Sequence, residues 1–573
     1  MTAVASMRLP KMFVGQRRRL FIWLVLNGLG QGLLAVLSAW MVKAVFDSVG
    51  SAAPTPMLVF LALGAAVIVV ALLRRIERVH AELLGQYYVR AVRSRLFSRL
   101  LDTDLRQFRQ HRKGGVLMKF VGDLSALRRW VSLGLARLLV ASAAVMIGLI
   151  ALYLLHWSFA VGVSAVLAGT TAWILWFSPR LRTLISEARR CHASLSANVS
   201  EKLAGLATVQ AFDERRRERR RLRVQSDRLI TASVRRAGSV GTLRAVIDAA
   251  AGGSVAVLIS IASLLPVNEL NAGMLAAAIS IVGFLTPPLR DVGRAQEYWL
   301  ASQVAKQHLA AVARRSVRIP RPRDADAVVI TEGSVRFESV RVDNVLETLN
   351  AAVTPRAKVA LMGANGSGKS TLLGLVGRLF DADAGRVLID GQDTAKVELS
   401  SLRRQVAYVS ADIPLIRGSL KKNITYGAGD VDTGELDRIL SACDLIELVA
   451  RVPGGLDARI AEGGTNLSQG ERVRVSLARA LLSSPKILLL DEADANLDLR
   501  AIRALNRVLE CFDGTVIMAT HRRTSWALCD TFWQLTDGVL KELPKPTRLD
   551  GDGDDAPCSS KVDVNIGHCE VRK

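Results

Sequence analysis

Residues 363–370 read G-A-N-G-S-G-K-S and match the phosphate-binding pattern G-x-x-x-x-G-K-[ST]. Glycines in such a loop let successive backbone N–H groups converge on phosphate oxygens. Lys369 would add a positive charge at the β and γ phosphates of a nucleotide, and the Ser370 hydroxyl would face a magnesium ion. Taken alone, the pattern also fits a chance glycine-rich turn.

The loop lies between an expected strand and an expected helix. The apolar segment 358–362 predicts a short buried strand, and residues 370–380 predict the helix whose N-terminus faces the anion. The predicted nucleotide-binding residues of this region are Gly363, Asn365, Gly366, Ser367, Gly368, Lys369, Ser370 and Thr371.

Two further apolar runs end in residues that suit phosphate chemistry. Residues 487–490 precede Asp491 and Glu492, so the first carboxylate can hold magnesium through water and the second can polarise an attacking water. His521 follows the apolar run 515–519 and would also lie at a strand's end. In isolation, the acidic pair equally fits a core strand capped by acids, and a lone histidine is more often structural than catalytic.

Residues 467–471, L-S-Q-G-E, complete the set. With this segment the chain resembles the ATP-binding cassette (ABC) superfamily, whose signature reads L-S-G-G-Q. In that family two cassettes sandwich two ATP molecules, so the resemblance implies that Ser468 and Gly470 bind the γ-phosphate held by an opposite cassette. Without the family, the segment is a serine-capped helix start, and the helix is expected over residues 471–483.

The resemblance also implies roles for the other motifs. Glu492 would be the catalytic base, His521 a catalytic phosphate contact, and Ser370 and Asp491 the ligands of Mg2+. The implied reaction is ATP hydrolysis coupled to transport across a membrane.

Several positions depart from the family pattern. Ala411 occupies the place of a glutamine that usually contacts magnesium and the membrane domain, and residues 340–344 offer no aromatic side chain to stack on adenine. Residues 495–498 read A-N-L-D in place of a serine-first loop. We therefore expect loosely held adenine and altered coupling. The lysine, the acidic pair and the histidine are present, so hydrolysis is still expected.

Everything ahead of the cassette has the composition of a membrane domain. Half of the 573 residues are hydrophobic and the mean hydropathy is +0.26, above the usual range of soluble proteins. Six apolar segments are long enough, or nearly so, to cross a hydrocarbon core about 30 Å thick. They are residues 20–45, 56–73, 131–155, 159–177, 243–265 and 272–289, the last ending at Pro287 and Pro288.

These segments and motifs predict a multi-domain membrane protein, in which an all-α six-helix transmembrane domain precedes an α/β P-loop NTPase domain of the ABC type. The predicted parts are a cytoplasmic N-terminal segment (1–19), the transmembrane domain (20–315) with two long cytoplasmic loops (74–130 and 179–242), the cassette (330–543) and a polar, disordered tail (544–573).

Arginine placement predicts the orientation. Residues 1–19 and the two long loops are rich in arginine, whereas residues 46–55 contain no lysine or arginine. Arginine-rich segments stay in the cytoplasm, so both termini are expected there. The net charge of +24 is accounted for by these segments and by anionic membrane lipids, so a nucleic-acid partner is not expected.

The long loops show helical periodicity. In the exporter-type branch of the family, such extensions end in coupling helices that dock on the cassettes. The resemblance implies coupling regions at residues 106–123 and 201–212, with residues 461–465 as the cassette segment that touches them. Solvated amphipathic helices are the alternative.

One chain carries one membrane domain and one cassette, as in a half-transporter. Because each ATP needs a signature from another cassette, we expect a second half-transporter as partner, in a homodimer more often than in a heterodimer. The predicted function is ATP-driven export or flipping of an amphipathic, lipid, peptide or drug-like substrate by alternating access. A membrane-anchored regulatory ATPase that senses without transporting is the alternative. The expected location is a bacterial inner membrane, and no cleavable signal is evident.

The polar candidates for function inside the spans are Asn27, Gln31, Arg137 and Asp248. Intramembrane ionisable groups are functional candidates by default. Arg137 and Asp248 lie near the predicted cytoplasmic ends, where snorkelling or pairing with each other is also expected. The six cysteines are expected to be free thiols.

Overall fold

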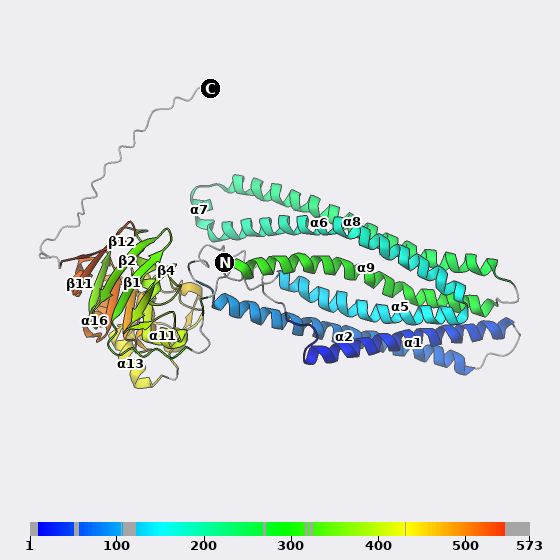
Figure 1. The fold of residues 1–573 in the computed structure, drawn as a ribbon, viewed down its shortest axis with the longest axis horizontal. Coiled ribbons are helices and arrows are strands. Elements are labelled where there is room, and N and C mark those ends of the chain that lie inside the picture. Colours follow the sequence, from blue (N-terminus) through cyan, green and yellow to red (C-terminus); the bar gives the residue numbers. More distant parts are fainter. Residues whose placement is uncertain are drawn as a thin grey trace, which may run out of the picture. The chain divides into compact units, whose positions relative to one another are not determined.

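The computed structural model describes residues 10–50, 57–104, 106, 122–266, 271–315, 319–320, 325–429 and 431–544. The chain divides into two compact units, residues 1–318 and 319–573. In the described residues the first unit is helical, and the second combines sheets with helices (Figure 1). The first predicted coupling region and the polar tail fall almost entirely outside the described residues.

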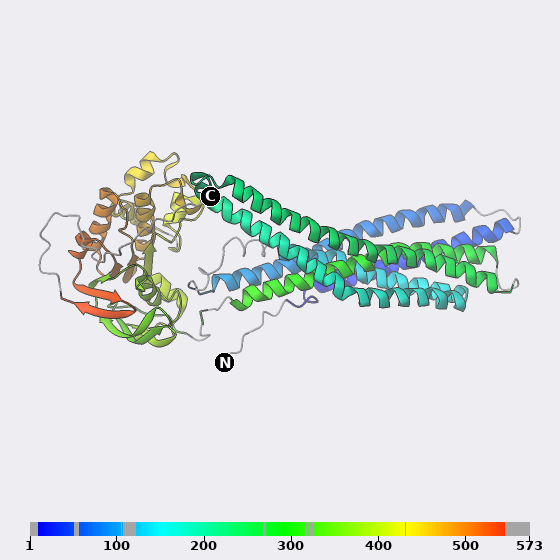
Figure 2. The same ribbon diagram turned by 90° about the horizontal axis from the view of Figure 1, so that it is seen from above.

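Six helical segments of the first unit are long and apolar enough to cross a membrane. They are α1 (Gln16–Gly50), α2 (Met57–Leu101), the segment Gly122–Leu155 that contains α5 (Ala136–Leu155), α6 (Trp157–Ala204), α8 (Arg215–Leu264) and α9 (Ala272–Arg315). About 20 residues suffice to cross a bilayer, so each helix continues beyond the hydrocarbon. Figure 2 shows α6 and α8 running side by side, and the short α7 (Leu206–Ala211) joins their ends.

A π-helical stretch, η1 (Trp130–Leu135), interrupts the third segment. The Trp130 ring folds over Gly134, where a Cβ atom would come within 2.5 Å of it. The same ring lies 4.8 Å from the Trp299 ring of α9. Glycine at position 134 therefore makes room for a large side chain between two helices.

Helix α9 continues through Pro287 and Pro288 and ends at Arg315. The end of the last apolar segment is therefore not the end of its helix. Proline removes a backbone hydrogen bond, but membrane helices tolerate it where neighbouring helices pack closely. Here α1, α5 and α8 all pack against α9.

The intramembrane charges are paired differently from the prediction. Arg137 Nη1 lies 2.9 Å from Asp291, and Asp248 lies 2.6 Å from Arg290 Nε. The predicted pairing of Arg137 with Asp248 is therefore wrong. Arg290 and Asp291 are successive residues of α9, and successive helical side chains point about 100° apart. One residue of α9 thus reaches α8 while the next reaches α5.

The second unit is built around a six-stranded sheet in the order β12-β11-β3-β10-β9-β6. Its strands are β3 (Lys358–Met362), β6 (Val406–Ser410), β9 (Ile487–Asp491), β10 (Thr515–Ala519), β11 (Thr531–Thr536) and β12 (Val539–Leu543). All but β12 run parallel. The continuous apolar runs predicted to be strands beside the phosphate-binding motifs are β3, β9 and β10, as expected for strands buried on both faces.

An antiparallel sheet and short helices complete this unit. The sheet has the order β2-β1-β4-β5, with β1 (Val335–Val342), β2 (Leu346–Val353), β4 (Ala384–Ile389) and β5 (Gln392–Asp393); a small pair joins β7 (Gly418–Ser419) and β8 (Arg459–Ile460). The helices are α10 (Lys369–Val376), α11 (Leu399–Gln405), α12 (Leu420–Ile424), α13 (Thr433–Ala442), α14 (Ile446–Arg451), α15 (Gln469–Leu481), α16 (Leu499–Cys511) and α17 (Arg523–Trp526).

The central sheet separates two apolar cores. Leu489 packs into the core shared with the antiparallel sheet, whereas Leu488 and Leu490 pack into the core beneath α15 and α16. Successive side chains of a strand point to opposite faces, so one strand serves both cores.

Two predicted helices have shifted ends. Helix α10 ends at Val376, four residues earlier than predicted, because Arg378 adopts a left-handed conformation with φ of +44°. Helix α15 spans Gln469–Leu481, two residues earlier at each end than the predicted 471–483.

Four cysteines lie in the described residues, and all four are free thiols: Cys191, Cys443, Cys511 and Cys529. Burial raises the pKa of Cys443 to about 12. This thiol is therefore protonated and inert in the folded protein. Cys558 and Cys569 lie outside the described residues.

Asp390, which directly follows β4, holds the backbone segment that precedes β1 of the antiparallel sheet. Its carboxylate accepts hydrogen bonds from the backbone N–H groups of residues 331–334, at 2.7–3.1 Å, and from the Ser334 hydroxyl. Burial acts to raise the pKa of Asp390, but these hydrogen bonds together hold the pKa below its usual range. The contribution to stability is thus present at neutral pH and is lost as the pH falls through the folded-state pKa.

We expect Asp390→Asn to lower the thermal unfolding midpoint of the cassette by about 2–4 °C at neutral pH, because an amide cannot accept all these bonds. The measurement is the unfolding transition of the cassette, followed by differential scanning calorimetry. The difference from wild type should shrink as the pH falls through the lowered folded-state pKa of Asp390. Asp437→Asn, on the exposed face of α13, is the control. A pH-independent difference would contradict this account.

Candidate functional site

The predicted motifs meet at one edge of the central sheet. Strands β3, β10 and β9 are neighbours and run parallel, so their carboxyl ends share that edge. The loop 363–368 follows β3, the acidic pair ends β9, and His521 follows β10. Ligands of parallel α/β sheets bind at the carboxyl ends of the strands.

The phosphate-binding loop packs closely around the Lys369 side chain and against β11. Lys369, the first residue of α10, is buried, and its Nζ donates to the carbonyls of Gly363 and Ala364 at 2.7 and 3.1 Å. A Cβ atom at Gly363 would meet the Leu535 carbonyl at 2.3 Å. Only glycine therefore fits where the loop passes β11.

The loop has a feature that suits an anion. Among the described residues, the buried Ser367 hydroxyl has no hydrogen-bond partner. Gly366 and Gly368 adopt φ of +87° and +108°, which favour glycine. Buried polar groups are normally hydrogen-bonded, and the N-terminus of α10 attracts negative charge. A phosphate oxygen would accept a hydrogen bond from the Ser367 hydroxyl and would place negative charge at the N-terminus of α10.

Asp491 is held by two hydroxyl groups from distant parts of the chain. Ser370 Oγ donates to its Oδ1 at 2.9 Å, and the Tyr408 hydroxyl donates to its Oδ2 at 2.7 Å. The carboxylate is buried at the end of β9. Carboxylate and hydroxyl oxygens are ligands that Mg2+ prefers, so Ser370 and Asp491 fit a magnesium site.

Tyr408 was not predicted as a site residue. It lies on β6, which pairs with β9 in parallel register. The only sequence signal was its place two residues before the carboxyl end of an expected neighbouring strand. Ala411, just beyond that end, is exposed.

Glu492 leaves the strand with an unusual backbone. Its φ is +49°, a left-handed value that is strained for a residue other than glycine. Its backbone N–H donates to the Ala519 carbonyl at 3.0 Å, and its carboxylate lies 3.7 Å from Lys369 Nζ. With 43% of its side chain exposed, Glu492 can reach a water molecule.

His521 is exposed, and the residue before it is firmly anchored. Thr520 Oγ1 donates to Asp494 Oδ2, which also accepts from Ser525 Oγ at 2.9 Å. Asp494 is only 2% exposed. Sequence reasoning missed this residue, although a third acid three positions after Asp491 was its visible signal.

The signature segment begins α15 with a capping box. Ser468 Oγ accepts from the Glu471 N–H at 3.2 Å, and the Ser468 N–H donates to Glu471 Oε2 at 2.8 Å. Burial acts to raise the pKa of Glu471, but hydrogen bonds from Ser468 and Arg451 hold it below its usual range. The serine cap read from the sequence is therefore present.

Gly470 packs closely on the start of α16. A Cβ atom there would lie 3.1 Å from both the Ala501 methyl and Asp498 Oδ1. In the described part of the chain, no hydrogen bond joins residues 467–471 to residues 363–370. The contacts described for Ser468 and Gly470 thus lie within residues 468–501.

Comparison with known proteins identifies the family. Residues 20–289 match the sequence model of the ABC transporter transmembrane region, and residues 346–495 match that of the ABC transporter. This chain belongs to the ABC transporter family. It is an ATP-driven exporter of the half-transporter type, with fused transmembrane and ATP-binding units, and the predicted fold class is confirmed.

Known ABC exporters resemble it over most of its length. Two proteins described as ATP-dependent lipid A-core flippases are similar: that of Syntrophus aciditrophicus is 24% identical over 89% of this chain and 86% of its own, and that of Vibrio parahaemolyticus is 27% identical over 79% of each. A solved structure of a bacterial Atm1-family ABC exporter with ATP bound covers 91% of this chain and 94% of its own, with a TM-score of 0.82 and 26% identity.

Mutation of Asp494 tests whether this residue holds the loop that carries His521 in place. Asp494→Ala leaves two buried hydroxyls without their acceptor, which should cost the cassette about 1–3 kcal/mol each in unfolding free energy. The loop carrying His521 would then move, and we expect kcat for ATP hydrolysis to fall about tenfold or more. Thermal unfolding and steady-state ATPase assays measure both effects. Asp513→Ala, whose side chain is 84% exposed, is the control and should change neither. Wild-type kcat in Asp494→Ala would contradict this role.

Proposed function

We propose that this ABC transporter moves an amphipathic molecule across a bacterial inner membrane, and that ATP is hydrolysed between the cassettes of two half-transporters. The observation that carries the proposal is the meeting of the phosphate-binding loop, the acidic pair and His521 at one sheet edge, in a chain that also has six membrane-spanning helices. Similarity to lipid A-core flippases supports an amphipathic substrate.

The residues divide the chemistry among them. Glu492 takes a proton from a water molecule whose oxygen attacks the γ-phosphorus, while the bond to the bridging β–γ oxygen breaks and ADP leaves. Lys369 and His521 contact the phosphates. Ser370 and Asp491 would hold Mg2+, which when bound would neutralise charge on the phosphate oxygens. Tyr408 and Asp494 act as positioning residues behind this set.

The signature completes the site from a second copy. Within one chain, Ser468 and Gly470 are anchored to residues other than the phosphate-binding loop, so their phosphate-facing role falls to a neighbouring cassette. Two copies of one chain form the commonest symmetric assembly, and we propose a homodimer. Both termini lie in the cytoplasm, where the arginine-rich segments are retained.

Coupling to the membrane runs through the second predicted region. It contains α7, and three of its hydrophobic side chains are exposed: Leu203, Leu206 and Phe212. Exposed hydrophobic side chains that form a contiguous patch mark interaction surfaces. We propose that it docks on a cassette, so that closure of the cassettes switches the membrane helices between inward-open and outward-open states.

The role of Glu492 is tested by Glu492→Gln. Because the amide cannot accept a proton, ATP hydrolysis should fall by about 100-fold or more while ATP binding is retained. The assays are phosphate release and retention of radiolabelled ATP in reconstituted vesicles. Glu510→Gln, exposed on α16, should hydrolyse ATP at the wild-type rate. Undiminished hydrolysis by Glu492→Gln would contradict the assignment.

The dimeric site is tested by crosslinking. A protein with both Ser468→Cys and Asn365→Cys should form a covalent dimer with a short bismaleimide when ATP is present. The protein with its native cysteines and each single variant are the controls and should stay monomeric on denaturing gels. Full turnover by single copies isolated in lipid nanodiscs would refute the shared site.

A further inference from the structure

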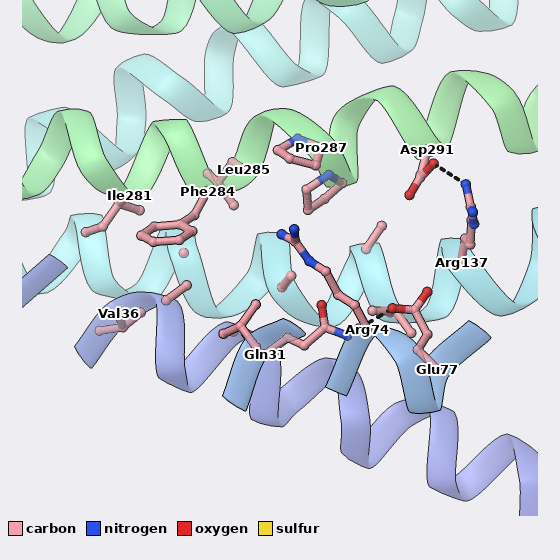
Figure 3. A pocket seen from close by; sticks show the side chains of 18 of the residues that line it. Gln31, Val36, Arg74, Glu77, Arg137, Ile281, Phe284, Leu285, Pro287 and Asp291 are labelled. Atoms are coloured by element: carbon pink, nitrogen blue, oxygen red, sulfur yellow. Dashed lines mark hydrogen bonds and ion pairs between the residues drawn. The ribbon is translucent and has the colours of Figure 1, made fainter. Parts of the chain in front are cut away.

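A cavity of about 310 Å³ lies among α1, α2, α5 and α9 of the membrane unit (Figure 3). Its wall is two-sided. One part is apolar and includes Val36, Ile281 and Phe284, whereas the other carries four arginines and two carboxylates. This volume is at the lower end of the range for small-molecule sites.

The carboxylates of the cavity already have partners. Gln31 Nε2 donates to Glu77 Oε2 at 2.9 Å and to Asn27 Oδ1 at 2.7 Å. Asp291 pairs with Arg137 at 2.9 Å and with Arg294 at 3.2 Å. The polar wall is therefore ordered by bonds within the protein.

Two arginines of the wall, Arg74 and Arg78, make no hydrogen bond or ion pair with any residue that the structure describes. Figure 3 shows the Arg74 side chain reaching from α2 into the cavity, toward Pro287 on α9. With more arginines than carboxylates, the cavity attracts an anion.

The charged wall lies where the apolar segments end. Arg74 directly follows the apolar run 57–73 of α2, Arg137 precedes the apolar run of α5, and Asp291 follows the last apolar segment on α9. A molecule that enters here meets charge at the level of the lipid headgroups and apolar side chains farther into the membrane. An amphiphile likewise has a charged headgroup at one end and an apolar part at the other.

We propose that this cavity recognises the exported molecule by its anionic headgroup, a phosphate or a carboxylate, which Arg74 binds directly while the hydrocarbon part lies along Ile281 and Phe284. The inference rests on the proposed function and specifies its substrate class. Arginine suits this task because its planar guanidinium donates two parallel hydrogen bonds to an oxyanion.

The test is binding of radiolabelled dodecyl phosphate to the full-length protein in phosphatidylcholine nanodiscs, without ATP. Arg74→Gln should weaken saturable binding about tenfold or more, because it removes a charge-assisted hydrogen bond. Arg74→Lys should bind with intermediate affinity, since it keeps the charge without the planar fork. Arg75→Gln, the adjacent exposed arginine that does not line the cavity, is the matched control and should bind as wild type does.

Competition by other molecules distinguishes the possible ligands. Neutral dodecyl glucoside and inorganic phosphate at equal concentration should fail to displace dodecyl phosphate from the wild-type protein. Equal displacement by dodecyl glucoside would show that the charge is not read, and equal displacement by inorganic phosphate would show a simple anion site. Either result, or wild-type affinity in Arg74→Gln, overturns the proposal. Because binding is measured without ATP, these results are separate from ATP-driven movement in vesicles, whose absence would instead overturn the proposed function.

Discussion

Parallel pairing of β3, β10 and β9 is the constraint on which the ATP-binding unit depends. It gathers three chain segments at one edge, although Ser370 and Asp491 are 121 residues apart in the sequence. Lys369 and Asp491 are buried at this edge, and burial of an unpaired charge is costly. Carbonyl groups and Glu492 compensate Lys369, and two hydroxyls compensate Asp491. Each buried charge at this edge of the sheet thus has partners within the protein.

Local pattern was enough to predict much of this unit. The strands beside the motifs are apolar on both faces, so their extent follows from a run of a few residues. Tyr408 and Asp494 could not be found in this way, because their hydroxyl and carboxylate contacts join residues 26 to 83 positions apart. Helix ends were missed by a few residues for another reason: α15 begins at its serine cap, and a left-handed residue follows the end of α10.

In the membrane unit, length and hydropathy were sufficient to predict six spans, but not which faces of the helices meet. The partner of Arg137 is 154 residues away, and it depends on how α9 is rotated against α5. Hydrophobic patterning carries little of that information in helices that are apolar on most sides. Prolines at positions 287 and 288 were also ambiguous, since their effect depends on the packing of neighbouring helices.

The length of the paired helices α6 and α8 has a mechanical consequence. The 50 residues of α8 extend about 75 Å, of which the hydrocarbon of a bilayer accounts for about 30 Å. More than half of the helix is therefore a stiff lever arm outside the hydrocarbon, braced along its length by α6. A tilt of about 10° at the membrane surface would sweep the far end of a roughly 45 Å arm through about 8 Å. Small changes in the tilt of α8 at the membrane therefore produce displacements of several ångströms at its far end.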